Sequence, residues 1–179
     1  MQITTKTSKI LADEHQNILK VIDALSDECN NLDVGKEINK DFLTKAIDFI
    51  RNYADRFHHA KEEDILFKEF VKCAEQEGSC VHCNPVEQML SEHDQGREFV
   101  KEMEQGLIKN NKEKVIEGIR GYTSLLKEHI FKEDNILYPM ADESLDKKTE
   151  ETMLKKFEKV EKERSADKRK YLAFVKSLR

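Results

Sequence analysis

The chain has 179 residues, of which 38 % are hydrophobic and 37 % are charged, and its net charge is −5. That length suits one domain with a single core. Nucleic-acid binders usually carry a basic stripe and a high pI, so this charge balance argues against a nucleic-acid partner. A membrane-spanning helix needs about 18 consecutive apolar residues, which the sequence lacks. Residues 1–13 also lack the apolar core of a signal peptide, so we expect a cytoplasmic protein.

Only six glycines and two prolines occur, which leaves few places for the chain to turn and favours long helices. Apolar residues at helical spacing predict five helices, over residues 8–30, 40–75, 85–109, 112–138 and 148–178. The fold class is therefore all-α. The first four helices predict an antiparallel up-and-down four-helix bundle in residues 1–142. The fifth predicts a charged C-terminal helix in residues 143–179, packed on the bundle or extending from it.

Each of the first four helices has one inward stripe. On the first helix the stripe is Leu11, His15, Ile18, Ile22, Leu25 and Cys29. On the second it is Leu43, Ile47, Ile50, Ala54, Phe57, His58, Ile65 and Leu66. On the third it is Val86, Met89, Leu90, His93, Val100, Met103 and Leu107. On the fourth it is Val115, Ile119, Tyr122, Leu125, Leu126, His129, Ile136 and Leu137, and we expect Pro139 to end this helix.

The fifth helix is the most highly charged. Its apolar positions are Met153, Phe157, Val160, Tyr171, Phe174, Val175 and Leu178, and they are interrupted over residues 161–170. The pattern predicts a helix docked on the bundle at its two ends, or a contact with a second copy or a regulatory protein partner. A solvated helix without a partner fits the pattern equally well.

Four of the six histidines fall on inward faces, one on each of the first four helices: His15, His58, His93 and His129. Two are followed by a glutamate one turn later, as His58-x-x-x-Glu62 and His129-x-x-x-Glu133. A buried carboxylate without a partner costs several kcal/mol or becomes protonated. A pair of divalent metal ions would neutralise both glutamates and use the imidazole lone pairs. The pattern therefore predicts a two-metal site.

Two alternatives bear on this prediction. A single inward histidine is more often a hydrogen-bonded core residue than a ligand, but four of them on four helices are hard to obtain from packing alone. His59-x-x-x-Glu63 has the same spacing as the chosen pair, yet the turns before His59 are polar. We therefore expect His59 to face solvent or to lie outside the direct ligand set. The Glu-x-x-His motif of ferritin-like bundles does not occur.

Four runs together resemble the HHE cation-binding branch of the hemerythrin family. They are Asp13-Glu-His15, His58-His-Ala-Lys-Glu-Glu-Asp-Ile-Leu-Phe67, Glu92-His-Asp-Gln-Gly-Arg97 and Glu128-His-Ile-Phe-Lys-Glu-Asp-Asn-Ile-Leu-Tyr-Pro139, and the resemblance covers residues 8–142. It implies an up-and-down bundle around two non-heme iron ions with an oxo or hydroxo bridge. By the same resemblance His15 and His58 bind one iron, His93 and His129 bind the other, and Glu62 and Glu133 bridge the two.

The sequence departs from oxygen-carrying hemerythrins at one histidine. Those proteins place a second histidine four residues after the third-helix ligand, where this chain has Arg97, which stays protonated and cannot bind iron. They also carry an aspartate five residues after the fourth-helix histidine. Asp134 stands at that spacing here, but Glu133 fits the HHE pattern better. The lost histidine leaves a coordination position open or filled by water.

Three other features lie near the predicted site. Tyr122 shares the face of His129 and either bonds a bound small molecule or is a core tyrosine bonded to a backbone carbonyl. Arg97 either pairs with Asp94 or a bridging carboxylate, or extends into solvent. Cys80-Val-His-Cys83 predicts a loop with two thiols, with a redox-active dithiol as the sharper hypothesis.

We therefore expect a di-iron protein that binds a small diatomic ligand such as dioxygen, for sensing, storage or delivery. The alternatives are a redox enzyme acting on peroxide or nitric oxide, and a protein that donates iron for repair. A third is a regulatory module whose fifth helix reports iron or oxygen status to a partner. Histidine and carboxylate ligands suit several metals, so manganese or zinc also fit the pattern.

Overall fold

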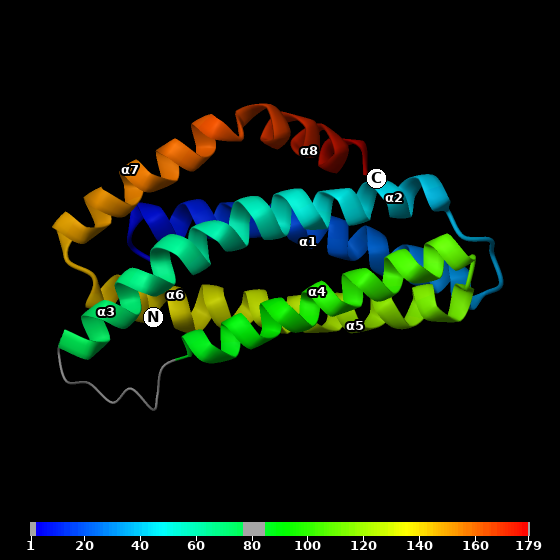
Figure 1. Ribbon diagram of the computed structural model, residues 1–179, viewed down its shortest axis with the longest axis horizontal. Helices are drawn as coiled ribbons and strands as arrows, with labels where there is room; N and C mark the ends of the chain where they lie inside the picture. The colour runs from blue at the N-terminus through cyan, green and yellow to red at the C-terminus, as the bar shows by residue number, and fades with distance from the viewer. Residues whose placement is uncertain (1–2, 77–84, 179) are drawn as a thin grey trace.

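A computed structural model describes residues 3–76 and 85–178, which form helices and turns but no strands. Four long antiparallel helical runs make a bundle, and two further helices lie along one side of it (Figure 1). The all-α helical bundle predicted from the sequence is confirmed. None of the described helices is both long and apolar enough to cross a membrane.

Three of the four runs have boundaries close to those predicted, and two are divided into α-helical and π-helical (η) segments. The first run is α1, Lys6–Asp33, and the third is α4, Val86–Lys109. The second consists of α2 (Lys40–Phe49), η1 (Ile50–His59), η2 (Glu62–Leu66) and α3 (Phe67–Gln76). The fourth consists of α5 (Lys112–Lys132), η4 (Glu133–Leu137) and α6 (Tyr138–Ser144).

Side-chain caps fix where several helices begin. Thr5 caps α1, Asn39 caps α2 and Asn111 caps α5, each by accepting a backbone N–H of the first turn. The turn between α4 and α5 is completed by Asn110, whose φ of 51° lies in the left-handed region. These two helices lie side by side in Figure 1. They approach closely because Gly118 has no Cβ, which would lie 2.8 Å from the backbone nitrogen of Met103.

The π segments change which side chains face inward. Their hydrogen bonds join residues five apart, so each turn is wider than the regular helical turn that the sequence pattern assumed. Ile136 in η4 was predicted to be inward but is 47 % exposed. Leu90, in the regular helix α4, was also predicted to be inward and is exposed. Pro139 does not end the fourth run, because it stands in the first turn of α6, where a backbone N–H is not required.

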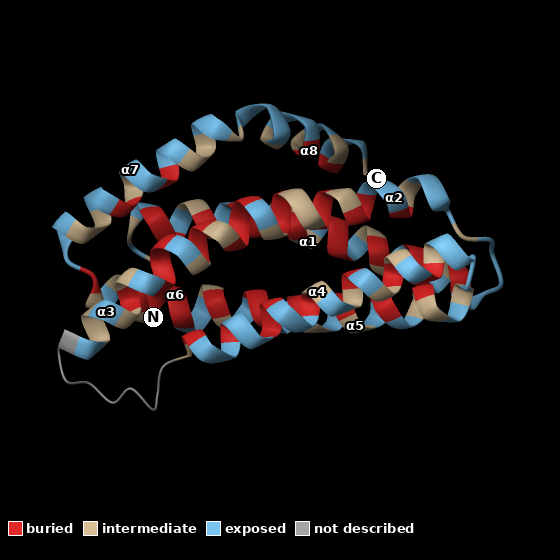
Figure 2. Ribbon diagram, in the orientation of Figure 1, coloured by how far each residue is buried: buried red, intermediate tan, exposed pale blue. Residues whose placement is uncertain are grey.

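The core has two apolar clusters with a polar layer between them. The larger cluster packs residues such as Leu25, Phe49 and Ile119, and the smaller packs residues such as Leu11 and Leu66. On each run the predicted histidine lies between residues of one cluster and residues of the other. Figure 2 shows buried residues along the facing sides of all four runs. The predicted site is therefore enclosed by apolar packing on both sides.

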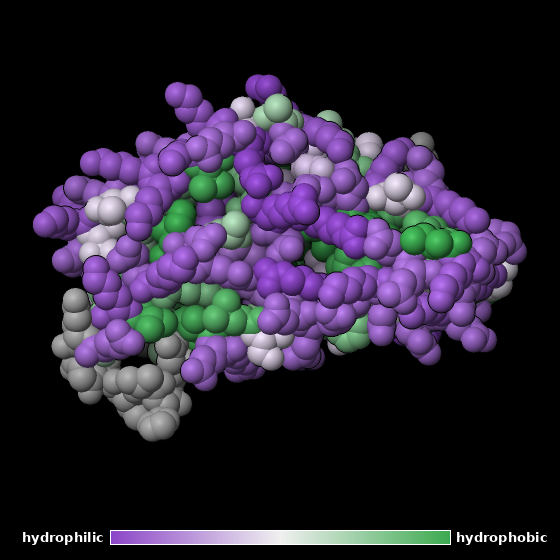
Figure 3. All heavy atoms as spheres, viewed as in Figure 1, coloured by the Kyte–Doolittle hydropathy of each residue, from purple (hydrophilic) through white to green (hydrophobic). Residues whose placement is uncertain are grey.

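The C-terminal segment forms two helices rather than the single one predicted: α7, Lys147–Glu163, and α8, Ser165–Ser177. The break lies in the stretch where the apolar stripe is interrupted. The predicted docking at two ends is observed, since Phe157 of α7 joins the smaller cluster and Tyr171 of α8 joins the larger one. Hydrophilic residues cover most of the face seen in Figure 3, and hydrophobic ones show as smaller patches among them.

Candidate metal centre

The six predicted residues meet in the polar layer, and all six are buried: His15, His58, Glu62, His93, His129 and Glu133. The histidines form two pairs. The Nε2 atoms of His15 and His58 are 2.9 Å apart, and those of His93 and His129 are 3.0 Å apart. The pairing is the one that the family resemblance implies for two metal ions.

Each glutamate reaches both histidine pairs. Glu133 places one carboxylate oxygen 3.2 Å from His15 Nε2 and the other 3.2 Å from His129 Nε2. Glu62 Oε2 lies 3.6 Å from the Nε2 atoms of both His58 and His93. This arrangement suits carboxylates that bridge two metal ions.

The orientation of the four imidazoles is set by a second group of carboxylates outside the centre. Each Nδ1 lies within hydrogen-bond distance of one of them, in the pairs His15–Asp134 at 2.8 Å, His58–Glu14 at 2.9 Å, His93–Glu63 at 2.8 Å and His129–Glu92 at 2.8 Å. An ionised carboxylate only accepts, so each Nδ1 carries the proton and donates. Each Nε2 therefore faces the centre, where its lone pair is available to a metal ion once the ring is neutral.

Sequence reasoning missed this outer group, although a local signal existed. Glu14 and Glu92 each precede a predicted histidine, while Glu63 and Asp134 each follow a predicted glutamate. The partners lie on different helices, so the pairing itself could not be read from spacing.

The electrostatics of the cluster fit bound cations. Three carboxylate oxygens, Glu62 Oε2 and both oxygens of Glu133, are buried without a hydrogen-bond partner among the described residues. Burial and the charge of Glu133 raise the pKa of Glu62. Burial opposes protonation of His15 and His129, but nearby carboxylates raise the pKa of His15 to about 8 and that of His129 to about 9. Without a metal, protons taken up by the histidines balance the charge of the buried carboxylates. Two divalent cations would supply that positive charge instead.

Tyr138 is a further buried member that sequence reasoning missed. Its hydroxyl donates to Glu62 Oε1 and lies 3.4 Å from His15 Nε2, and its ring stacks on His15 with centroids 5.6 Å apart. Tyr138 follows Glu133 by five residues, and the π segment η4 between them turns both inward.

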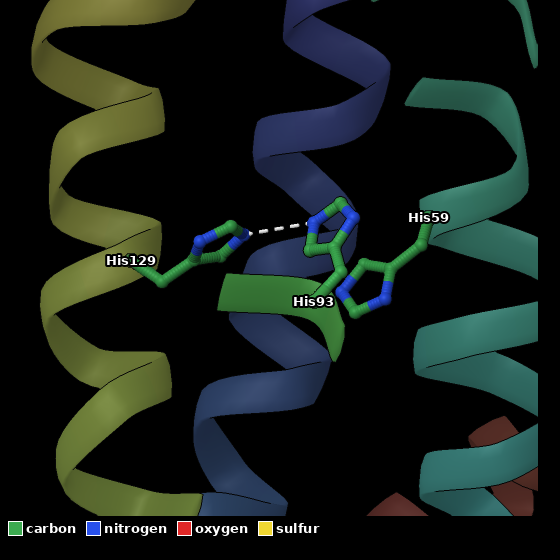
Figure 4. Close-up of side chains that lie close together, drawn as sticks. All are labelled: His59, His93 and His129. Carbon is green, nitrogen blue, oxygen red and sulfur yellow. Dashed lines mark hydrogen bonds between the residues drawn. The ribbon is translucent and has the colours of Figure 1, made fainter. Parts of the chain in front are cut away.

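The prediction that His59 faces solvent is wrong, and the alternative, that it lies outside the direct ligand set, stays a prediction. His59 is only 7 % exposed, and its ring stacks on that of His93 with centroids 3.8 Å apart and planes 12° apart. The reason is η1, because its wide turn lets His58 and His59 both face the bundle interior. Figure 4 shows the His59, His93 and His129 rings extending from three helices into one space. Burial and the adjacent His93 lower the pKa of His59, which favours the neutral ring.

Arg97 and Tyr122 also lie close to the centre. The predicted pairing of Arg97 with Asp94 is confirmed, at 2.8 Å, and Arg97 also binds Asp55 and Glu63. Tyr122 is buried, and its hydroxyl has no hydrogen-bond partner in the described part of the chain, so the expected bond to a backbone carbonyl is wrong. Tyr122 and His59 line a pocket of about 870 Å³.

A family model for the hemerythrin HHE cation-binding domain matches residues 6–141, which include all six predicted residues. The chain belongs to the hemerythrin HHE cation-binding family. The resemblance read from the sequence is thus confirmed, and this hemerythrin-type domain is a metal-binding helical domain. No curated protein and no solved structure matches the chain.

The dithiol hypothesis stays a prediction. Cys80, Cys83 and His82 lie outside the described residues. Cys29 is buried in the larger apolar cluster of this hemerythrin-type bundle.

Proposed function

We propose that the cluster holds two iron ions and that the centre binds dioxygen or a related small molecule, for sensing, storage or delivery. The observation that supports this most is the reach of Glu62 and Glu133, each of which lies between both histidine pairs. A carboxylate that serves one metal ion has no reason to face two pairs of imidazoles. Carboxylates in such a position favour a two-metal centre.

Iron is the metal that this donor set favours within the family. Imidazole nitrogen and carboxylate oxygen both suit iron, and the excess of imidazole suits reversible binding of a small molecule. When bound, the iron pair would supply a redox-active site with a position for an exogenous ligand. The protein's own part is to direct four Nε2 lone pairs inward, to supply two negative charges and to exclude water with the two apolar clusters.

The test is metal analysis with an optical spectrum, on protein purified anaerobically and then exposed to air. We expect about two irons per chain and a new near-ultraviolet or visible band that disappears when oxygen is removed. The matched variants are His58→Ala and Glu62→Ala, which should lose the metal and the band. A parent protein that takes up no metal and is no more stable than these variants would overturn the proposal.

A second outcome would favour the redox enzyme. If the two irons oxidise irreversibly in air, peroxide or nitric oxide should be supplied together with a reductant, and turnover followed. Sustained turnover that His58→Ala abolishes would replace binding by catalysis as the function of this centre. Loss of iron to a metal-free acceptor protein, without turnover, would indicate iron donation.

A further inference from the structure

The pocket of about 870 Å³ beside the candidate metal centre has walls from η1, α4 and α5. It borders the centre through His93 and His59, whose rings stack on each other (Figure 4). Part of its inner wall is formed by three residues of the larger apolar cluster, none more than 4 % exposed: Ile50, Val100 and Leu126. Its volume falls in the range of about 300–1,000 Å³ that is usual for small-molecule sites.

Tyr122 brings one polar group to this apolar wall. Its side chain lines the pocket and is only 2 % exposed, and its hydroxyl has no hydrogen-bond partner among the residues described. A buried hydroxyl without a partner destabilises the folded state. A molecule in the pocket that carried an accepting oxygen would remove this penalty, because a phenol O–H can donate to it.

Gly96 of α4 leaves space free next to Tyr122. A Cβ at this position would lie 3.5 Å from a methyl of Leu126 and 3.8 Å from the ring of Tyr122. These are ordinary van der Waals separations, so packing would accept an alanine, and alanine is more favourable than glycine inside a helix. The local structure thus gives no reason for glycine here, whereas a ligand that uses the space does.

The charged side chains that line the pocket indicate which ligands it favours. Most of them are already paired, as Arg51–Glu104, Arg97–Asp55, Arg97–Asp94 and Lys101–Glu98. The first two pairs join η1 to α4 and so hold the two walls in position without a ligand. Arg56 is exposed and donates to Asn52 of its own helix. A charged ligand would have to break existing pairs or be buried without a partner, so the pocket favours a neutral molecule.

We propose that this pocket binds a neutral, mainly apolar organic molecule whose single oxygen accepts a hydrogen bond from Tyr122. Such a ligand would lie against His59 and therefore next to the half of the centre that contains His93. This binding site is additional to the proposed binding of a diatomic molecule at iron. Neither the pocket nor the hydroxyl of Tyr122 depends on bound metal, so the absence of iron and the absence of this ligand are separate outcomes.

The first test is equilibrium dialysis of the full chain against three probes of similar size. 2-Acetylnaphthalene has a carbonyl oxygen, 2-ethylnaphthalene has a similar shape without the oxygen, and 2-naphthoate is charged. We expect about one molecule of the ketone to bind per chain, at least about fivefold more tightly than the other two, as one hydrogen bond provides. Equal binding of ketone and hydrocarbon would overturn the proposal and leave water as the partner of Tyr122. Tighter binding of 2-naphthoate would equally overturn it, since the ligand would then be an anion.

Tyr122→Phe separates recognition of the oxygen from apolar contact. The variant should bind the ketone and the hydrocarbon equally, so the fivefold preference should disappear. Tyr53→Phe is the matched control, because it also removes the hydroxyl of a buried tyrosine in the larger cluster, but that hydroxyl accepts from Asn17. It should keep the preference of the parent. A preference that survives in Tyr122→Phe would show that the oxygen binds elsewhere and would contradict the proposal.

Gly96→Ala tests whether the ligand uses the space beside Tyr122. The added methyl should weaken binding of the ketone and of the hydrocarbon by at least about threefold, because it occupies volume that either probe needs. Urea unfolding is the control, and it should show a variant at least as stable as the parent. Unchanged binding of both probes would place them outside the pocket and overturn the proposal.

A measurement on the unaltered protein covers variants that fail to fold. A naphthyl ketone that carries a photoreactive diazirine should, after irradiation, label peptides within residues 50–59, 91–101 or 122–126, which contain the pocket lining. An excess of 2-acetylnaphthalene should suppress this labelling, and an equal excess of 2-naphthoate should not. Suppressible labelling found only in other segments would overturn the assignment of the site.

Discussion

The two halves of the centre have the same inner chemistry but different surroundings. In each half a Glu-His pair on one helix meets a His-x-x-Lys-Glu motif on another, and the lysine binds the glutamate of the Glu-His pair. Lys61 is fully buried, lies 3.9 Å from the centre of the Phe57 ring and reaches Glu161 of α7 at 3.1 Å. Its counterpart Lys132 is 26 % exposed in its side chain and has no contact with α7 among those described.

A second difference lies five residues beyond each glutamate. Tyr138 stacks on His15 and bonds Glu62, whereas Phe67 stacks on His93 with centroids 6.1 Å apart and has no hydroxyl. The half with His15 and His58 is thus covered by α7 and carries a hydroxyl, while the half with His93 and His129 borders a pocket. The two halves therefore repeat the ligand pattern, but elements outside that pattern set the environment of each ion.

The largest effect is expected from a residue that both halves share. Glu133→Ala removes the two carboxylate oxygens that face His15 and His129, so both ions should be lost together rather than one. We expect metal affinity to fall by at least about 100-fold, measured by Co²⁺ or Fe²⁺ titration. His15→Ala is the control, because it removes an imidazole from one half and should weaken the ion of that half before the other. If Glu133→Ala kept one ion at parental affinity, the glutamate would serve a single half.

The next largest effect should be a difference in stability between variants of Lys61 and Lys132. Lys61→Met leaves Glu14 buried without its cation and should lower the free energy of unfolding of the metal-free protein by about 3–5 kcal/mol. Lys132→Met acts at a partly exposed pair and should cost less than about 1 kcal/mol. Urea unfolding of both variants measures the difference. Equal losses would mean that α7 does not set the environment of Lys61.

The hydroxyl of Tyr138 should have a smaller effect. Tyr138→Phe removes its hydrogen bond to buried Glu62, which should destabilise the metal-free protein by about 1–2 kcal/mol and alter the spectrum of the loaded centre. Tyr171→Phe is a suitable control, because its hydroxyl bonds Asp48 away from the centre. A loaded spectrum that changes in Tyr171→Phe but not in Tyr138→Phe would contradict the assignment.

The smallest expected effect tests the regulatory hypothesis. His58, Glu14, Lys61 and Glu161 form a continuous chain of contacts from the centre to α7. Metal loading should therefore slow protease cleavage within residues 147–177 by about twofold to fivefold, because proteases cleave the segment only when it opens locally. Glu161→Gln should abolish the difference, and Glu163→Gln, at an exposed pair, should not. Identical cleavage of loaded and metal-free parent would remove the support for this coupling.

The sequence by itself determined the four helical runs and the six clustered residues. Helical periodicity is a local property, so spacings of three and four residues place His58 and Glu62 on one face before any tertiary contact is known. The break between the predicted helices 85–109 and 112–138 is confirmed at Asn110 and Asn111, where Asn110 adopts the left-handed conformation and Asn111 caps the next helix.

Only the tertiary structure decided the rest. The π turns that bring His59 and Tyr138 inward depart from the regular period on which sequence reasoning relies. The outer carboxylates bond histidines on other helices, as Glu14 does to His58 across 44 residues, and no local spacing encodes such a pair. Arg164, where the predicted fifth helix divides into α7 and α8, lies within the interrupted stripe. The division lets each helix bury its own apolar residues on the bundle, and that surface exists only once the bundle has formed.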